Sequence, residues 1–500
     1  MCDPRTPDDT GELRHLDRAH LPAAAGALLD AGSRLALVAC HEDDDEFRIV
    51  YSFVGPIPSP RADLSVSVPR DDAWIPSLAE VSLSAGNFER GIRDLYGVVP
   101  RNHPQPHRLV RHGHWPRGWY PMLRANGVVP DFEPDVESFP FVPVEGPGVY
   151  EIAVGPIHAG IIEPGHFRFS VVGETIVRME ARQWYLHRGV EKVFEGKTAA
   201  EGVVLAEQIS GDTAVGHSLA FVMAVERAAG IEVSEPDRLL RALLLELERL
   251  YNHVTDLGSL ANDVGFGIID AHAQGLRERL LRINKSVTGH RLLRGALSVG
   301  GTRVNALPEA ADLASVTAAM AELAGITLGH AIVRGRFTGT ARLSNAHATA
   351  IGTLGYVGRA SGIDTDARRD HPFVDLGEAF HVVTEEGGDV LARYTVRARE
   401  VEVSTAVAFD LIRRLRGHNG TGLSVNPTTA GTGLALVEAW RGTAAHRVEL
   451  APDGTLARVK VVDPSFLNWP AVPQALSETI VPDFPLANKS FNLSYAGNDL

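Results

Sequence analysis

The sequence predicts an α+β N-terminal domain over residues 1–125, followed by a mostly α-helical domain with small flanking β elements over residues 150–500. Three observations predict this division. Strand-like and helical runs alternate up to about residue 125, proline and glycine crowd residues 126–149, and long helical patterns dominate the rest of the chain. A chain of 500 residues is long enough to bury a core in each part.

In the first domain, residues 16–29 are rich in alanine and leucine, which predicts a helix. The apolar runs 35–40 and 47–53 lie on either side of the acidic turn 41–45, which predicts a β-hairpin. Residues 126–149 then hold five prolines, at positions 130, 134, 140, 143 and 147. Because proline lacks the backbone N–H that a helix uses, this segment is predicted to be a linker.

The second domain opens with two strand-like runs, 150–154 and 166–172, joined by the loop 155–165. Residues 238–253 repeat leucine at the i, i+3, i+4 spacing of a core helix, which would end at His253. Asp256 follows three residues later and would form a polar rim pair with His253. Further expected elements are helices over 217–229, 271–286 and 308–331 and short strands within 448–462.

Composition excludes several classes of protein. The formal charge is −14, with no long basic block, which argues against a nucleic-acid partner. We see neither the apolar stretch of a signal peptide nor an apolar run of about 18 residues, so we expect a cytoplasmic location. Cys2 and Cys40 are the only cysteines, too few to hold an iron-sulfur cluster or to form a disulfide framework.

A series of short motifs follows in order along the chain: 87–97 with His103-Pro104, 155–158, 165–166, 187–191, 245–253, 262–265 and 290–295. In this order the sequence resembles the C-type subunit of respiratory complex I fused to the D-type large subunit. That large subunit is shared by complex I and the membrane-bound, formate-hydrogenlyase-type nickel-iron hydrogenases. The resemblance implies a helical bundle flanked by small β elements for the second domain.

Hydrogenase members of this family hold nickel and iron with two Cys-x-x-Cys pairs. The resemblance maps these pairs onto Ser210, Thr213, Ser465 and Asn468, so no thiolate remains. Neutral oxygen groups cannot replace four soft thiolates, and no nickel-iron centre is expected. With Asp212 and Asp463 they could offer oxygen ligands to a hard cation, but we favour helix caps or turns at these positions.

In complex I the corresponding large subunit forms a quinone-head pocket from a loop histidine and a tyrosine. The resemblance places the histidine at His166, with His158 as its neighbour, and the tyrosine at Gly211, so the second quinone contact is absent. Asp212, Thr213 or His217 could line the same cavity.

The segment 187–191 abuts the active cavity in relatives. Glu191 would relay protons if burial raised its pKa, and would otherwise form a surface ion pair. The expected catalytic residues are therefore His166, His158, Glu191 and Asp212, in or beside a cavity lined by Ser210, Thr213, Ser465, Asn468, His217 and Asp463, with no metal.

The resemblance implies an oxidoreductase: the peripheral large subunit of a membrane-associated complex similar to NADH-quinone oxidoreductase or to energy-converting hydrogenases. It would dock a small partner protein that holds a 4Fe-4S cluster and handle electron transfer at a quinone-type cavity. Membrane subunits would hold it at the cytoplasmic face of the membrane. The chain lacks a Gly-x-Gly-x-x-Gly motif between a strand and a helix, so any NAD-linked activity would come from other subunits. The alternatives are a non-catalytic assembly scaffold and, less favoured, an active nickel-iron hydrogenase.

Overall fold

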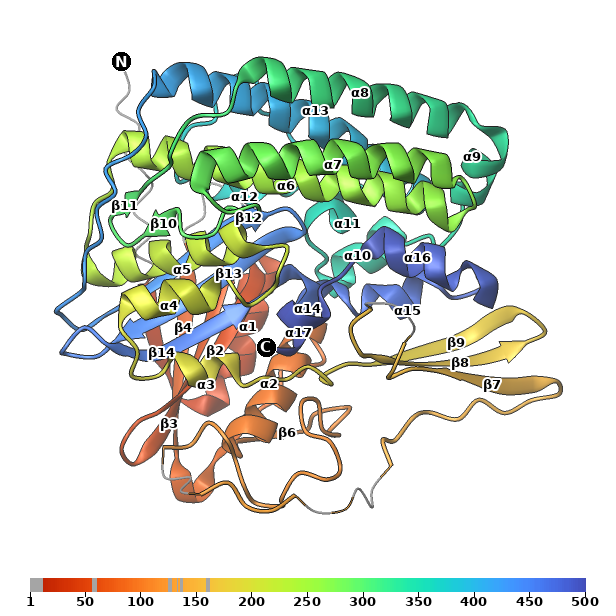
Figure 1. Cartoon of the computed structure of the whole chain (residues 1–500). Helices are drawn as coiled ribbons and strands as arrows, with labels where there is room; N and C mark the ends of the chain where they lie inside the picture. The colour runs from red at the N-terminus through yellow and green to blue at the C-terminus, as the bar shows by residue number, and fades with distance from the viewer. Residues whose placement is uncertain (1–11, 56–60, 125–127, 133, 135–137, 159–161) are drawn as a thin grey trace.

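The computed structural model describes residues 12–55, 61–124, 128–132, 134, 138–158 and 162–500 (Figure 1). The first part of the chain forms a four-stranded sheet, a two-stranded parallel pair and two helices. Its elements are β1 (Glu12–Leu16), α1 (Leu21–Asp30), β2 (Arg34–Glu42), β3 (Glu46–Val54), β4 (Ala62–Pro69), β5 (Trp74–Pro76), α2 (Leu83–Tyr96) and β6 (Val99–Arg101).

The predicted hairpin is confirmed. Strands β2 and β3 pair antiparallel with Cys40 opposite Ile49, and the sheet order is β1-β4-β3-β2, with β1 parallel to β4. The helix expected over 16–29 begins later, at Leu21. Residues 12–16 are used as a sheet strand instead, and the Asp17 side chain caps a short 3-10 turn before Pro22 starts the helix.

The second part contains most of the helices. Its elements are β7 (Val149–Val154), β8 (His166–Val172), β9 (Thr175–Arg182), α3 (Val190–Phe194), α4 (Ala199–Ala206), α5 (Ala214–Ala229), α6 (Glu235–Asp263), α7 (Gly267–Thr288), β10 (Leu297–Ser298), β11 (Gly301–Thr302), α8 (Ala310–Gly329), α9 (Ala331–Phe337), α10 (Asn345–Ile351), α11 (Gly355–Arg359), α12 (Ala367–Asp370), α13 (Val390–Leu415), β12 (Gly431–Ala439), β13 (Gly442–Leu450), β14 (Leu456–Val462), α14 (Pro464–Asn468), α15 (Ala471–Ala475), α16 (Phe484–Phe491) and α17 (Tyr495–Asp499). The described residues of 128–148 form no helix or strand.

The long helices α6, α7, α8 and α13 lie side by side as a bundle (Figure 1). The helix predicted over 238–253 is confirmed but extends in both directions, since Ser234 caps its first turn and its apolar side continues to Leu260 and Ala261. Helix α13 is missing from the sequence prediction. Its inward side carries Arg393, Arg397 and Glu400, and charged residues on a buried side hide the helical pattern.

The sheet β12-β13-β14 lies between the bundle and the N-terminal sheet (Figure 1). Helix α5 packs on β12 and β13, while β2 contacts β13 and β14. Leu434 and Leu436 of β12 therefore share one apolar cluster with Leu37 of β2. The two parts of the chain meet through a buried apolar interface, so the N-terminal sheet is fixed against the site described next.

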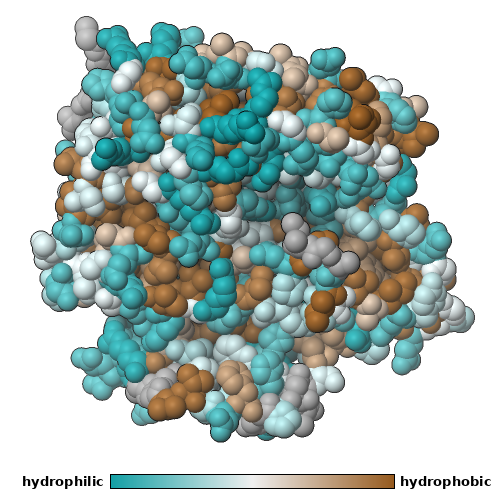
Figure 2. Space-filling model, viewed as in Figure 1, coloured by the Kyte–Doolittle hydropathy of each residue, from teal (hydrophilic) through white to brown (hydrophobic). Residues whose placement is uncertain are grey.

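Strands β7 and β8 pair antiparallel as predicted, and β9 adds a third strand that the sequence did not suggest. One described helix, α8, is long and apolar enough to span a membrane, although it contacts α7 and α13 along one side. Apolar side chains remain at the surface near its end, including Ile326 and Ile332, and brown patches lie in this region of Figure 2.

Candidate functional site

The segment that precedes α5 meets the segment that precedes α17 at the expected metal-ligand positions. The hydroxyl oxygens of Ser210 and Ser494 lie 2.8 Å apart. Ser210 and Thr213 each donate a hydrogen bond of 3.0 Å to the same carboxylate oxygen of Asp212. Arg441 closes the group, because its two terminal nitrogens lie 2.6 and 2.7 Å from the two Asp212 oxygens. The result is a bidentate ion pair surrounded by hydroxyls.

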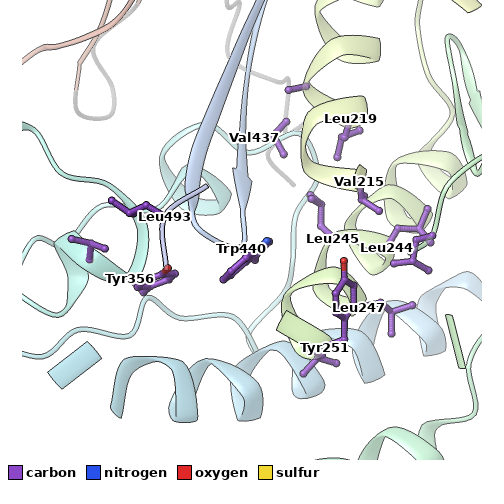
Figure 3. Packing of buried hydrophobic residues seen from close by; sticks show 14 of the residues in the cluster. Val215, Leu219, Leu244, Leu245, Leu247, Tyr251, Tyr356, Val437, Trp440 and Leu493 are labelled. Atoms are coloured by element: carbon purple, nitrogen blue, oxygen red, sulfur yellow. The ribbon is translucent and has the colours of Figure 1, made fainter. Parts of the chain in front are cut away.

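Trp440 holds this ion pair in place. The Arg441 guanidinium lies 4.0 Å from the centre of the Trp440 ring, which stacks on Tyr356 with 6.2 Å between ring centres. Figure 3 shows Trp440 between Tyr356 and Leu493 on one side and the helix residues Leu245 and Tyr251 on the other. The indole N–H, the Tyr251 hydroxyl and the Asn252 amide all donate to the backbone carbonyl of Asp212.

Partial burial opposes ionisation of Asp212, but the adjacent charge of Arg441 outweighs it and lowers the pKa of this carboxyl. Asp212 is therefore ionised and locked to Arg441. Its side chain is 39% exposed in the isolated chain, which leaves this edge of the site open to a partner.

Behind the ion pair lies a buried chain of two histidines and a carboxylate. His217 Nε2 donates to Asp463 Oδ2 over 2.9 Å, and its Nδ1 lies 3.1 Å from Nε2 of His446. Burial holds the pKa of His446 well below its usual value, so its ring is neutral. Sequence reasoning missed His446. The one feature of the sequence that could have indicated it is a single histidine within the apolar strand β13, where its side chain is fully buried.

The side chains at the two remaining ligand positions, Ser465 and Asn468, already have hydrogen-bond partners within the fold. The Ser465 hydroxyl accepts from the Ser494 backbone, and Asp463 caps α14 by accepting from the Ser465 N–H, as we favoured. The Asn468 amide pairs with both backbone groups of Leu354, at 2.8 and 3.1 Å. Asn468 is therefore not part of the group around Asp212, and Ser494 is the residue that meets Ser210.

His166 lies in a different cavity of about 320 Å³ between the first part of the chain, residues 138–141 and the sheet β7-β8-β9. The lining side chains are cationic, imidazole, aromatic or small: Arg108, His112, Gly113, Ser138, Phe139, Phe141, His166, Arg168, Arg182 and Tyr185. His166 Nδ1 donates to the Gly155 carbonyl over 3.1 Å, while its buried Nε2 has no partner among the described residues.

His158 braces the loop rather than lining this cavity, since its Nε2 donates to the Gly165 carbonyl over 2.8 Å. Positions 159–161 of the same loop lie outside the described residues. Gly165 contacts the Tyr495 ring, and Tyr495 follows Ser494. The His166 cavity and the Asp212 group do not share a lining, since neither Asp212 nor Arg441 is among the residues that line the cavity.

Glu191 forms a buried ion pair with two basic residues. Its carboxylate lies 2.6 Å from Arg458 and 2.8 Å from Lys460, and it also accepts from the Val461 N–H. Burial would raise the pKa of Glu191, but the charges of Lys460 and Arg458 outweigh burial and lower it to about 2. The condition set for a proton relay, a pKa raised by burial, is not met. Glu191 does form an ion pair, but the pair is buried, whereas the alternative expected it on the surface.

The expected end of a helix at His253 was wrong. His253 lies inside α6 with no exposed surface, and its Nε2 donates to Glu400 over 2.7 Å. Asp256, expected at an exposed rim, lies 3.0 Å from the buried Arg397. Both side chains belong to the interior, where α6 and α13 exchange ion pairs.

Comparison with known proteins agrees with this architecture. A family model described as the 30 kDa subunit of respiratory-chain NADH dehydrogenase matches residues 14–127, and one described as the 49 kDa subunit matches residues 263–429. Formate hydrogenlyase subunit 5 of Escherichia coli strain K12 is 32% identical over 424 residues, which cover 82% of this chain and 74% of that protein. The chain belongs to the complex I and formate-hydrogenlyase family of large subunits.

Other members support the C/D fusion. The C/D subunit of NADH-quinone oxidoreductase from Phocaeicola vulgatus is 28% identical over 369 residues, covering 69% of this chain and 70% of that protein. A chain in the solved membrane-bound sulfane sulfur reductase, an archaeal respiratory membrane complex, has a TM-score of 0.65. At 23% identity, over 71% of this chain and 99% of that one, it shows a shared fold. The predicted family and its oxidoreductase class are confirmed.

The residues present do not fit a nickel-iron centre. Ser494 and Gly497 have the spacing of a Cys-x-x-Cys pair and lie opposite the Ser210 segment. A side chain at Gly497 would approach Asp463 Oδ2 to 2.5 Å, so this position cannot take a cysteine unless Asp463 moves. Among the described residues, no group of three or more His, Cys, Asp or Glu is arranged to hold a metal ion.

We therefore expect no stoichiometric nickel in the natively purified complex, because the facing positions supply hydroxyl groups and a glycine instead of thiolates. Elemental analysis by inductively coupled plasma mass spectrometry checks this. One nickel per chain would contradict our assignment of the site.

Proposed function

We propose that this family member passes electrons from an iron-sulfur partner to a quinone-type acceptor in the His166 cavity, without a redox metal of its own. The observation that carries the proposal is the unpartnered, buried Nε2 of His166 beside a cavity of about 320 Å³. Three cationic and three aromatic side chains around it suit a polar ring. The open edge at Asp212 is the proposed contact with the partner.

The geometry of His166 suits proton delivery. A carbonyl oxygen only accepts hydrogen bonds, so Nδ1 must carry the proton that it donates to Gly155. In the neutral ring Nε2 is therefore an acceptor, and it becomes a donor once the ring takes up a second proton. Because His166 belongs to the cavity lining, an acceptor that has gained electrons there would take this proton.

Relatives are named as subunits of hydrogenlyase, hydrogenase and NADH-quinone oxidoreductase, and the structural neighbour comes from a respiratory membrane complex. We propose that membrane subunits hold this chain at the cytoplasmic face of the membrane and that a 4Fe-4S cluster lies in the partner.

The test is electron transfer from the natively purified, cluster-reduced complex to a soluble short-chain quinone analogue. We expect His166→Ala to lower the rate at least tenfold, since general acid catalysis contributes on the order of a hundredfold or more. His347→Ala is the matched control, because His347 is an exposed histidine on α10. The amount of every subunit and the cluster spectra must be equal in all preparations.

Each outcome has one meaning. A wild-type complex with intact clusters that reduces no quinone analogue refutes the proposal and supports the alternative, a non-catalytic scaffold. Equal rates for wild type and His166→Ala refute the role of His166. A rate that is lost only in His166→Ala supports both the proposed electron transfer and the role of His166.

A further inference from the structure

Arginine side chains gather at the His166 cavity, although the protein as a whole is acidic. The chain carries a formal charge of −14, yet the described residues that line this cavity include Arg168 and Arg182 and no aspartate or glutamate. Arg108 also lines the cavity but already has a partner of its own. A neutral quinone ring needs hydrogen-bond donors but does not need the guanidinium groups of Arg168 and Arg182. The arginines of the lining therefore indicate the chemical class of the ligand, which His166 alone does not.

The arginines are arranged around a wall of aromatic rings that are tilted against one another. Phe139 and Phe141 have ring centres 4.8 Å apart, and the Phe141 ring lies 5.3 Å from that of His166. The Arg182 guanidinium carbon lies 4.7 Å from the centre of the Phe139 ring, and that of Arg168 lies 4.4 Å from the centre of Phe141. The rings of Phe139 and Phe141 thus alternate with planar guanidinium groups, whose N–H donors suit a carboxylate.

Arg182 keeps its positive charge inside the cavity. It is 3% exposed and donates to the backbone carbonyls of Leu109 and Arg111, which are neutral partners. Burial lowers the pKa of Arg182 to about 10, so it remains charged at neutral pH.

Two carboxylates lie close by on the sheet but outside the lining. Glu151 approaches Arg168 to 3.5 Å from an exposed position, and Glu180 is engaged by Arg178 and by the Val142 N–H. Because both carboxylates lie outside the lining, the arginines Arg168 and Arg182 are the charged groups that face the cavity, and they attract negative charge in a ligand.

We propose that this cavity binds a small, planar, ring-bearing carboxylate, with the ring against Phe139 and Phe141 and the carboxylate on Arg168. A volume of about 320 Å³ is near the lower limit of typical ligand pockets, which favours a ligand of one or two rings without a long tail. This ligand class extends the proposed function, because it rests on the same cavity. Binding of the carboxylate does not itself require electron transfer.

Isothermal titration calorimetry of the natively purified complex with 2-naphthoate tests the inference without any electron transfer. We expect saturable binding that weakens several-fold when the salt concentration rises from 50 to 500 mM, because salt screens charge attraction. The uncharged 2-naphthamide should bind at least tenfold more weakly. Arg168→Gln should weaken 2-naphthoate binding about tenfold, as expected for a lost charge-assisted hydrogen bond.

The charge-matched control is Arg282→Gln, an exposed position on α7 that should bind 2-naphthoate as wild type does. Three results would overturn the inference: no binding to wild type, equal binding of naphthoate and naphthamide, or equal losses in the two arginine variants. Binding with no quinone reduction would refute the proposed electron transfer alone. Quinone reduction without naphthoate binding would refute the ligand class alone.

Discussion

Replacing Arg359 by methionine is expected to destabilise the protein by about 3–5 kcal/mol, the cost of leaving buried charges without their partner. Arg359 has no exposed surface, and its guanidinium donates to Glu400 over 3.0 Å and to Glu438 over 2.7 Å. Asp366 lies 3.3 Å away as a third carboxylate. Urea unfolding of wild type and Arg359→Met at neutral pH measures the difference.

The reason for this large effect is that each carboxylate joins different elements to Arg359. Glu400 comes from α13 and also accepts from His253 of α6, while Glu438 comes from β12. Burial opposes ionisation of Glu400, but the charge of Arg359 outweighs it and holds the pKa of Glu400 well below its usual value. Without the guanidinium, these buried carboxylates repel one another in a low-dielectric environment.

A second variant keeps the prediction testable if Arg359→Met does not fold. Arg359→Met with Glu400→Gln removes one of the orphaned charges, so the double variant should be more stable than Arg359→Met alone. Arg282→Met is the surface control, since Arg282 is 76% exposed and its pair with Glu278 should contribute no more than about 1 kcal/mol. A single variant within about 1 kcal/mol of wild type would contradict the ion-pair account.

Glu191→Gln is expected to lose about 3 kcal/mol of stability at neutral pH, with a specific pH dependence. The pKa of Glu191 is lowered from 4.5 to about 2 in the folded protein. A lowered carboxyl pKa contributes stability that is present above pH 4.5 and is lost as the pH falls from 4.5 through 2. The stability difference between wild type and variant should therefore shrink over this interval.

Denaturant unfolding at pH 7, 5, 4 and 3 measures this difference. Glu322→Gln, at an exposed position on α8, is the control and should follow wild type at each pH. A deficit in Glu191→Gln that stays constant between pH 5 and pH 3 would contradict the ion-pair assignment. Because Arg458 also donates to the Cys40 carbonyl of β2, the variant should loosen contact between the N-terminal sheet and β14 as well.

Pattern alone predicted the elements whose buried side is apolar. The leucines of 238–253 and the hairpin strands around Cys40 repeat at helix and strand spacing because these side chains avoid water. Helix α13 and the continuation of α6 past His253 were missed for the opposite reason. Their inward residues Arg397, Glu400 and Asp256 are charged, and only partners from other elements make such positions interior.

The sequence by itself determined the family, the class of oxidoreductase and the lack of thiolates at Ser210 and Thr213, because order and spacing of motifs and residue identity are local properties. Only the tertiary structure decided which groups meet. It brought Ser494 to Ser210, paired Asp212 with Arg441 and placed His166 in a separate cavity. The first two of these contacts join residues 284 and 229 positions apart, and the packing of whole elements sets all three.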